Sequence, residues 1–149
     1  MATTITPADA VATLGVTLTL GGKTFDISFS NTISSCTQAL REIIEIPITE
    51  VDIFGLTSAG TVGKGTFLDF DGFFIMNRDD TNFIRLRWLE TGGDTVDFKL
   101  EAGQFMILWN SNIEVNTTGA AFGAFVALDT VAVQADTAPV DIEILAIKI

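Results

Sequence analysis

Apolar and polar residues alternate over residues 84–100, and this alternation predicts a β-hairpin. When the chain is folded about the loop Glu90–Asp94, apolar residues pair on one face and mostly charged residues pair on the other. An apolar face backed by a charged one is typical of an antiparallel sheet with one buried side, so we expect Trp88 to be buried. The expected pairs are Ile84–Leu100, Leu86–Phe98 and Trp88–Val96 on the apolar face, and Arg87–Asp97 and Arg85–Lys99 on the charged face.

A second hairpin is predicted around Gly21 and Gly22, because glycines supply the positive φ angles of a two-residue type I′ turn. Folding there places apolar residues of the two strands opposite one another, while small polar and acidic residues take the other face. Two separate hairpins that close on apolar pairs indicate antiparallel β-structure. The apolar pairs are Leu18–Phe25, Val16–Ile27 and Leu14–Phe29, and the polar face holds Thr17, Thr19, Asp26 and Ser28.

Three segments leave alternatives open. Residues 31–41 are ambiguous, and a short helix over Thr37–Ile43 is one interpretation. The β-branched residues over 42–53 favour a strand, which Pro47 places at a sheet edge or on a bulge. In the last predicted strand, Val140–Ile149, the apolar positions change phase, which indicates either a bulge or burial of both faces near the chain end.

The whole chain is predicted to fold as one all-β domain. About ten short strands are separated by turn residues at short spacing, which is the pattern of a β-sandwich or barrel. We expect an antiparallel β-sandwich, jelly-roll-like, that spans residues 1–149 and begins with a short N-terminal arm over about residues 1–10. Near the end of this domain, strands are expected over Ala120–Leu128 and Val131–Gln134, on either side of Asp129 and Thr130.

The composition adds an excess of apolar residues to this picture. Hydrophobic residues make up 48% of the chain, and the mean hydropathy is +0.44. Either several strands are buried on both faces, or part of the surface is a subunit interface. We expect a homo-oligomer, a trimer, whose interface uses the run Ala120–Ala127 or the C-terminal strand. The candidate interface residues are Phe122, Phe125, Val126, Ile147 and Ile149.

The net charge of −11 changes the classes of partner that we expect. With 19 acidic residues, eight basic ones and no histidine, the chain repels nucleic acid and anionic membranes, and we expect neither as a partner. The first residues contain no basic segment and no sustained apolar segment, so we expect synthesis in the cytoplasm without a signal peptide. The lone cysteine, Cys36, excludes an intramolecular disulfide.

Carboxylates are the first candidates for chemistry, and each has a simpler structural interpretation. Asp69 and Asp71 lie in a D-x-D-G string, which supplies too few ligands for a closed calcium loop and suits a strand end that turns at Gly72. Asp79 and Asp80 are the kind of pair that a glycosidase uses, but adjacent loop aspartates are far more often turn formers. We therefore expect no metal and no cofactor.

The remaining motifs do not build a catalytic site either. The run Gly60–Gly65 lacks the spacing of a phosphate-binding loop, and no helical pattern follows it. The thiol of Cys36 has no histidine anywhere in the chain to activate it. Without a nucleophile and a base, the chain is predicted not to be an enzyme.

Residues between Phe74 and Leu108 resemble a pattern found in small β-sandwich structural proteins of tailed bacteriophages. The pattern reads I-x-N-x-D-x-T-N-[FY]-[IV] and then [KR]-L-x-x-G-[EQ]-F, and the resemblance covers roughly a quarter of the chain. The second part also resembles a segment of cupins, whose metal-binding histidines this chain lacks. The residues that carry the resemblance are Ile75–Asn77 and Asp80–Leu86, followed by Lys99–Phe105.

The resemblance implies a non-catalytic structural protein of a phage virion. The form that we expect is a capsid decoration (cement) protein on the capsid exterior, with further copies of the chain and other virion proteins as partners. The alternatives are a small tail, neck or fibre-associated protein, and a carbohydrate-binding module. A carbohydrate site needs exposed aromatic residues in a polar-rimmed groove, whereas the loops 78–82, 90–94 and 110–119 contain no aromatic residue.

Overall fold

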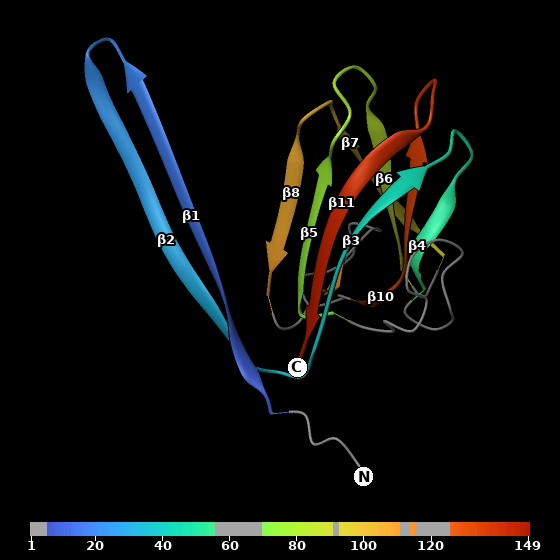
Figure 1. Cartoon of the computed structure of the whole chain (residues 1–149), viewed down its shortest axis with the longest axis horizontal. Coiled ribbons are helices and arrows are strands. Elements are labelled where there is room, and N and C mark those ends of the chain that lie inside the picture. The colour runs from blue at the N-terminus through green and yellow to red at the C-terminus, as the bar shows by residue number, and fades with distance from the viewer. Residues whose placement is uncertain (1–5, 56–69, 91–92, 111–113, 116–125) are drawn as a thin grey trace.

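The computed structural model describes residues 6–55, 70–90, 93–110, 114–115 and 126–149, and this part of the chain is built from β-strands (Figure 1). Within these residues, no helix has the length and hydropathy needed to cross a membrane. The strands are β1 (Ala8–Leu20), β2 (Lys23–Cys36), β3 (Gln38–Ile46), β4 (Val51–Gly55), β5 (Gly72–Asn77), β6 (Ile84–Glu90), β7 (Thr95–Leu100), β8 (Phe105–Trp109), β9 (Glu114–Val115), β10 (Val126–Ala135) and β11 (Val140–Lys148).

Two antiparallel sheets pack against each other as a sandwich-like body, which confirms the predicted all-β class. One sheet has the strand order β3-β11-β5-β8, and the other has the order β4-β10-β6-β7, with β9 paired to β10. Consecutive strands such as β3 and β4, or β5 and β6, lie in different sheets, an alternation that jelly rolls also have. The jelly-roll connectivity itself stays a prediction. The largest fully buried side chains between the sheets are Phe54, Phe73, Ile46, Ile53, Ile75, Ile84, Leu86, Ile142 and Ile144.

The β6–β7 hairpin has the register that the alternation predicts. Ile84 lies opposite Leu100, Leu86 opposite Phe98, and Trp88 opposite Val96, with Arg87–Asp97 and Arg85–Lys99 between them. The apolar positions of β6 face the core, and Trp88 is only 5% exposed. Its ring packs edge-on against Phe98, with 5.5 Å between the ring centroids. The predicted burial of Trp88 is therefore confirmed.

The β1–β2 hairpin also has the predicted register, but it lies outside the sandwich. Leu18 pairs with Phe25, Val16 with Ile27, and Leu14 with Phe29. The turn glycines adopt positive φ angles of 57° at Gly21 and 77° at Gly22, as a type I′ turn requires. Figure 1 shows this hairpin, in blue, extending from the base of the body and diverging from the β8 edge. We call β1 and β2 together the arm.

The helix considered over Thr37–Ile43 is wrong, because these residues belong to the arm–body junction and to β3. The backbone N–H of Thr37 donates to the carbonyl of Lys148, and β3 then pairs with β11 along its whole length. Partners more than a hundred residues away therefore decide the local structure. The strand expected over 42–53 is split at Pro47: edge strand β3 ends at Ile46, and β4 begins after the proline.

The last strand resolves the phase change in favour of burial on both faces. β11 pairs with β3 and β5 without a register shift, so it contains no bulge. Ile142 and Ile144 face the core, while Ile147 on the opposite face is 4% exposed. Upstream, β10 continues through Asp129 and Thr130 as one strand, with a register shift between Leu128 and Thr130.

Candidate interaction surface

The outer face of the β4-β10-β6-β7 sheet is a polar face suited to water. Arg87 on β6 makes a two-pronged ion pair with Asp97 on β7, at 2.7 and 2.8 Å. Hydrogen bonds from this guanidinium hold the pKa of Asp97 below its usual range. Arg85 and Arg87 also pair with Glu50. This face matches the charged side of an antiparallel sheet that has its other side buried.

The outer face of the β3-β11-β5-β8 sheet has the opposite character. Across it, Leu145 of β11 lies beside Phe74 of β5, which lies beside Ile107 of β8. Phe105 stacks near Phe74, with 5.9 Å between ring centroids, and remains 52% exposed. Ile43 on the edge strand β3 is 63% exposed. We call this surface the apolar face, because the residues at its centre are apolar.

A salt-bridge cluster lies within this apolar face, and two exposed carboxylates, Glu45 and Asp141, lie opposite each other at one end of it. Glu143 on β11 is almost buried, and its carboxylate accepts hydrogen bonds from Arg41 at 2.6 and 2.9 Å and from Arg78 at 2.9 Å. The bonds from Arg41 are the main reason that the pKa of Glu143 lies below its ordinary value. The cluster neutralises a carboxylate that would otherwise leave the face unsuited to apolar contact.

We expect Glu143→Gln to lower the melting temperature at pH 7, because the charged partner of two arginines is lost. A carboxyl whose pKa is lower in the folded state than in the unfolded state stabilises the fold above its ordinary pKa of 4.5, and this stabilisation disappears as the pH falls through the folded pKa. The difference in melting temperature between wild type and variant should therefore shrink between pH 5 and pH 3. The control is Glu45→Gln on β3, and a difference that is constant with pH would contradict the assignment.

The arm presents a second apolar surface. The side chains on one face of β1 and β2 are about half exposed or more, including Leu18 at 53%, Leu20 at 67%, Phe25 at 54% and Ile27 at 65%. The opposite face carries threonines, serines and Asp26. A two-stranded ribbon on its own is marginally stable in water at best. The apolar side of the arm is therefore a surface that contact with another element would stabilise.

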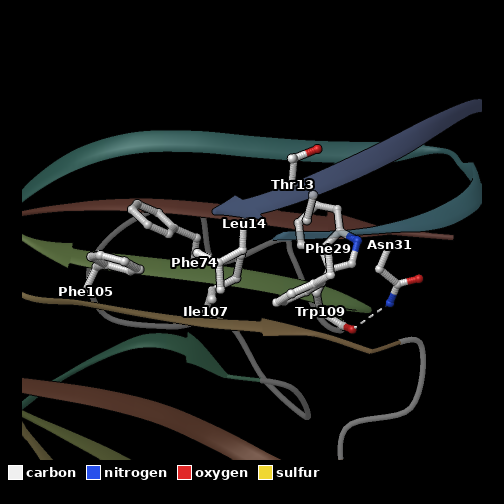
Figure 2. A pocket seen from close by; sticks show the side chains of 9 residues that line it. Thr13, Leu14, Phe29, Asn31, Phe74, Phe105, Ile107 and Trp109 are labelled. Atoms are coloured by element: carbon white, nitrogen blue, oxygen red, sulfur yellow. Dashed lines mark hydrogen bonds between the residues drawn. The ribbon is translucent and has the colours of Figure 1, made fainter. Parts of the chain in front are cut away.

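A groove separates the base of the arm from the apolar face. It has a volume of about 400 Å³, and Figure 2 shows Leu14 and Phe29 of the arm facing Ile107 and Trp109 of β8. Between two of the lining residues, the Asn31 side-chain amide donates to the Trp109 carbonyl at 3.4 Å. No residue that lines the groove is charged. The lining residues are Ala12, Thr13, Leu14, Phe29, Asn31, Phe74, Phe105, Ile107 and Trp109.

The interface residues predicted from the sequence fall in different places. Phe122 and Phe125 lie outside the described residues, and Val126 begins β10, where its backbone pairs with Val115. Ile147 is buried within the chain, where its side chain fills the space that a Cβ on Gly72 would occupy. Ile149 is 47% exposed, and its backbone N–H donates to the Asp71 carboxylate at 2.7 Å.

The residues considered for chemistry have structural roles where they are described. The Asp79 carboxylate accepts the backbone N–H groups of Thr81 and Asn82 at 2.7 and 2.6 Å, and these bonds lower its pKa. Asp80 accepts a hydrogen bond from the Thr81 hydroxyl. The thiol of half-buried Cys36 donates to the Ile33 carbonyl. Asp69 and Gly60–Gly65 lie outside the described residues.

The two apolar surfaces, the arm and the apolar face, were not predicted as exposed surfaces from the sequence. For the apolar face, the sequence does carry a signal. β5 and β8 are apolar at every position from Phe73 to Met76 and from Phe105 to Trp109, so neither of their faces is polar. Within the described residues, no group of three or more Cys, Asp or Glu side chains is placed to hold a metal ion. The ionisable side chains that the described residues do bring together form ion pairs, such as Glu143 with Arg41 and Arg78.

Comparisons of the chain with protein-family models, with curated proteins and with solved structures found no match.

Proposed function

We propose that this chain is a non-catalytic structural protein that acts by binding other protein subunits. The observation that supports this function is the pair of apolar surfaces, the arm and the apolar face. Leu20 on the arm and Ile43 on the face each leave about two thirds of the side chain in water. Large apolar patches of this kind on soluble proteins mark sites of protein contact.

The assembly that we propose is a tailed-phage particle, with the chain as a decoration protein on the capsid exterior. The proposal rests on the resemblance over residues 75–105. Asn77 of this motif is fully buried, and its side-chain amide donates to the carbonyls of Asn82 at 2.8 Å and of Leu100 at 3.2 Å. With Asp79 it holds the corner between β5 and β6. Roles of this kind support a shared fold and not a shared catalytic site.

The charge of the chain supports contact with protein and not with a packaged genome. A net charge of −11 opposes binding to nucleic acid. The cations expected at the rim of the contact are Lys23 at the arm tip, Arg78, which pairs with Glu143, and Lys64, which lies outside the described residues. Because buried apolar contact is not screened by salt, high salt should weaken binding only modestly.

The experiment is to mix the purified protein with tailed-phage particles that lack it and to image the particles by electron cryomicroscopy. We expect stoichiometric and symmetric occupancy of the capsid exterior. Occupancy of the tail instead would replace the capsid role with the tail alternative. Absence of the protein from both capsid and tail would contradict the proposed phage function.

A further inference from the structure

We infer that the arm of one copy of this chain binds the apolar face of a second copy. This inference rests on the proposed structural function and names the partner of the two surfaces. Arm and face are both apolar, both exposed, and both present on every copy. Three further observations favour a second copy as the occupant: the length of the arm, the area of the two surfaces and the distribution of charge.

The arm is too long to be covered by the body from which it extends. A hydrogen bond joins Asn31 to Trp109, so these two residues mark the same level along the arm and along β8. From Trp109, β8 continues only as far as Phe105. Strands rise by about 3.4 Å per residue, so the length of β8 from Trp109 to Phe105 equals the length of the arm from Asn31 to Ile27. The tip beyond this point, with Leu18, Leu20 and Phe25, extends past β8, and no element of the described part of the chain covers these exposed side chains.

The exposed apolar area matches what a stable interface requires. A large side chain that is about half exposed presents roughly 90 Å² to solvent. Nine such side chains therefore offer about 800 Å², close to the apolar share of about 900 Å² in a standard interface. The six on the arm are Val16, Leu18, Leu20, Phe25, Ile27 and Phe29, and the three on the face are Ile43, Phe105 and Ile107.

The charge distribution permits contact between two copies of a strongly acidic chain. At −11 each, two copies repel one another unless they meet through surfaces with few carboxylates. The arm is such a surface, because its charged residues are only Asp9, Lys23 and Asp26, and Asp26 lies on its polar side. On the apolar face, Glu143 is neutralised by Arg41 and Arg78, and the other two carboxylates, Glu45 and Asp141, lie opposite each other at the end of the face beyond Ile43 and Glu143.

The two surfaces differ from each other, so the arm–face contact can close in two ways: as a two-fold dimer in which each arm lies on the apolar face of the other copy, or as a head-to-tail ring. In such a ring, every copy has its arm covered by one neighbour and its apolar face covered by the other. The predicted trimer is the smallest ring of this kind. The groove at the base of the arm lies beside Phe105 and Ile107, where the arriving tip would meet the face.

A cross-linking experiment between two differently tagged, co-expressed chains tests the contact. Both chains carry Cys36→Ser; one carries Phe25→Cys at the arm tip and the other Phe105→Cys on the apolar face. Each chain then has a single cysteine, so a short bismaleimide can join only different chains. We expect the mixed covalent dimer in several-fold higher yield than in the control, where Thr17→Cys on the polar side of the arm replaces Phe25→Cys.

Equal yields from the two arm positions would overturn the inference, and so would products formed only between two Phe25→Cys chains. A monomeric mass without cross-links would overturn it as well. These outcomes are independent of the phage proposal, since the purified protein is used without particles. If the protein is a monomer but still occupies capsids, the inference fails and the proposed function stands. If the copies cross-link as expected but do not bind phage particles, the proposed phage function fails and the inference stands.

Discussion

Removal of residues 16–27, with a two-glycine turn in their place, is expected to make the protein monomeric without unfolding the sandwich. Gly15 and Ser28 face each other in the arm, so the new turn preserves the register of the remaining strands. The deletion removes five large exposed apolar side chains. At about 1 kcal/mol for each half-exposed side chain, association should weaken by more than about a thousandfold. Light scattering reports the mass, and thermal melting reports the fold.

Two substitutions serve as matched controls for the shortened arm. Ile27→Asp places a charge on the apolar side and should also prevent association, whereas Thr17→Asp places the same charge on the polar side and should leave the mass unchanged. A shortened protein that keeps the mass of wild type would show that the arm is not the contact. Loss of cooperative melting in the shortened protein would show instead that the arm is part of the folded core.

The Trp88→Ala substitution is expected to destabilise the fold by about 3–5 kcal/mol, the range for truncation of a large buried aromatic side chain. Trp88 is 5% exposed and packs between β7 and β10, opposite Val96 and Val131. In a domain of this size, the melting temperature should fall by about 10 °C or more. Thermal melting of the soluble fraction measures the loss, and much of the variant is expected to be insoluble.

Comparison with two other substitutions separates burial from aromatic character. Phe105→Ala removes an aromatic ring that is 52% exposed, so the isolated fold should lose far less stability. Trp88→Phe should cost less than Trp88→Ala, because the indole Nε1 is buried without a hydrogen-bond partner in the described part of the chain. A soluble Trp88→Ala protein with wild-type melting would contradict the core packing described for β6.

The hairpins could be predicted from the sequence because their determinants are local. Turn glycines and the alternation of Leu14, Val16 and Leu18 determine the register of the arm without reference to other strands. The helix considered over Thr37–Ile43 was wrong because β3 is formed by pairing with β11, at the far end of the chain. Local propensity carries no information about a partner at that distance.

The exposure of the two apolar surfaces could not be predicted in the same way. An alternating strand has the same sequence pattern whether its apolar side faces its own core or another chain, so Phe25 and Ile27 were recognised as paired but not as exposed. Continuous apolar runs such as Phe105–Trp109 do indicate that both faces of a strand are covered. In β8 the inner face meets the core, while the outer face retains exposed Phe105 and Ile107.

Hydroxyl-radical footprinting of the purified wild-type protein at micromolar concentration tests the central claim most directly, because it reports which side chains water reaches. Ile48 is 50% exposed and gives the reference labelling rate for an exposed side chain, and Phe73 is fully buried and gives the reference rate for a buried one. If the chain is a structural subunit that associates through its arm, Phe25, Ile27 and Phe105 should be labelled nearly as slowly as Phe73. Labelling of these three side chains at the rate of exposed positions would contradict the claim.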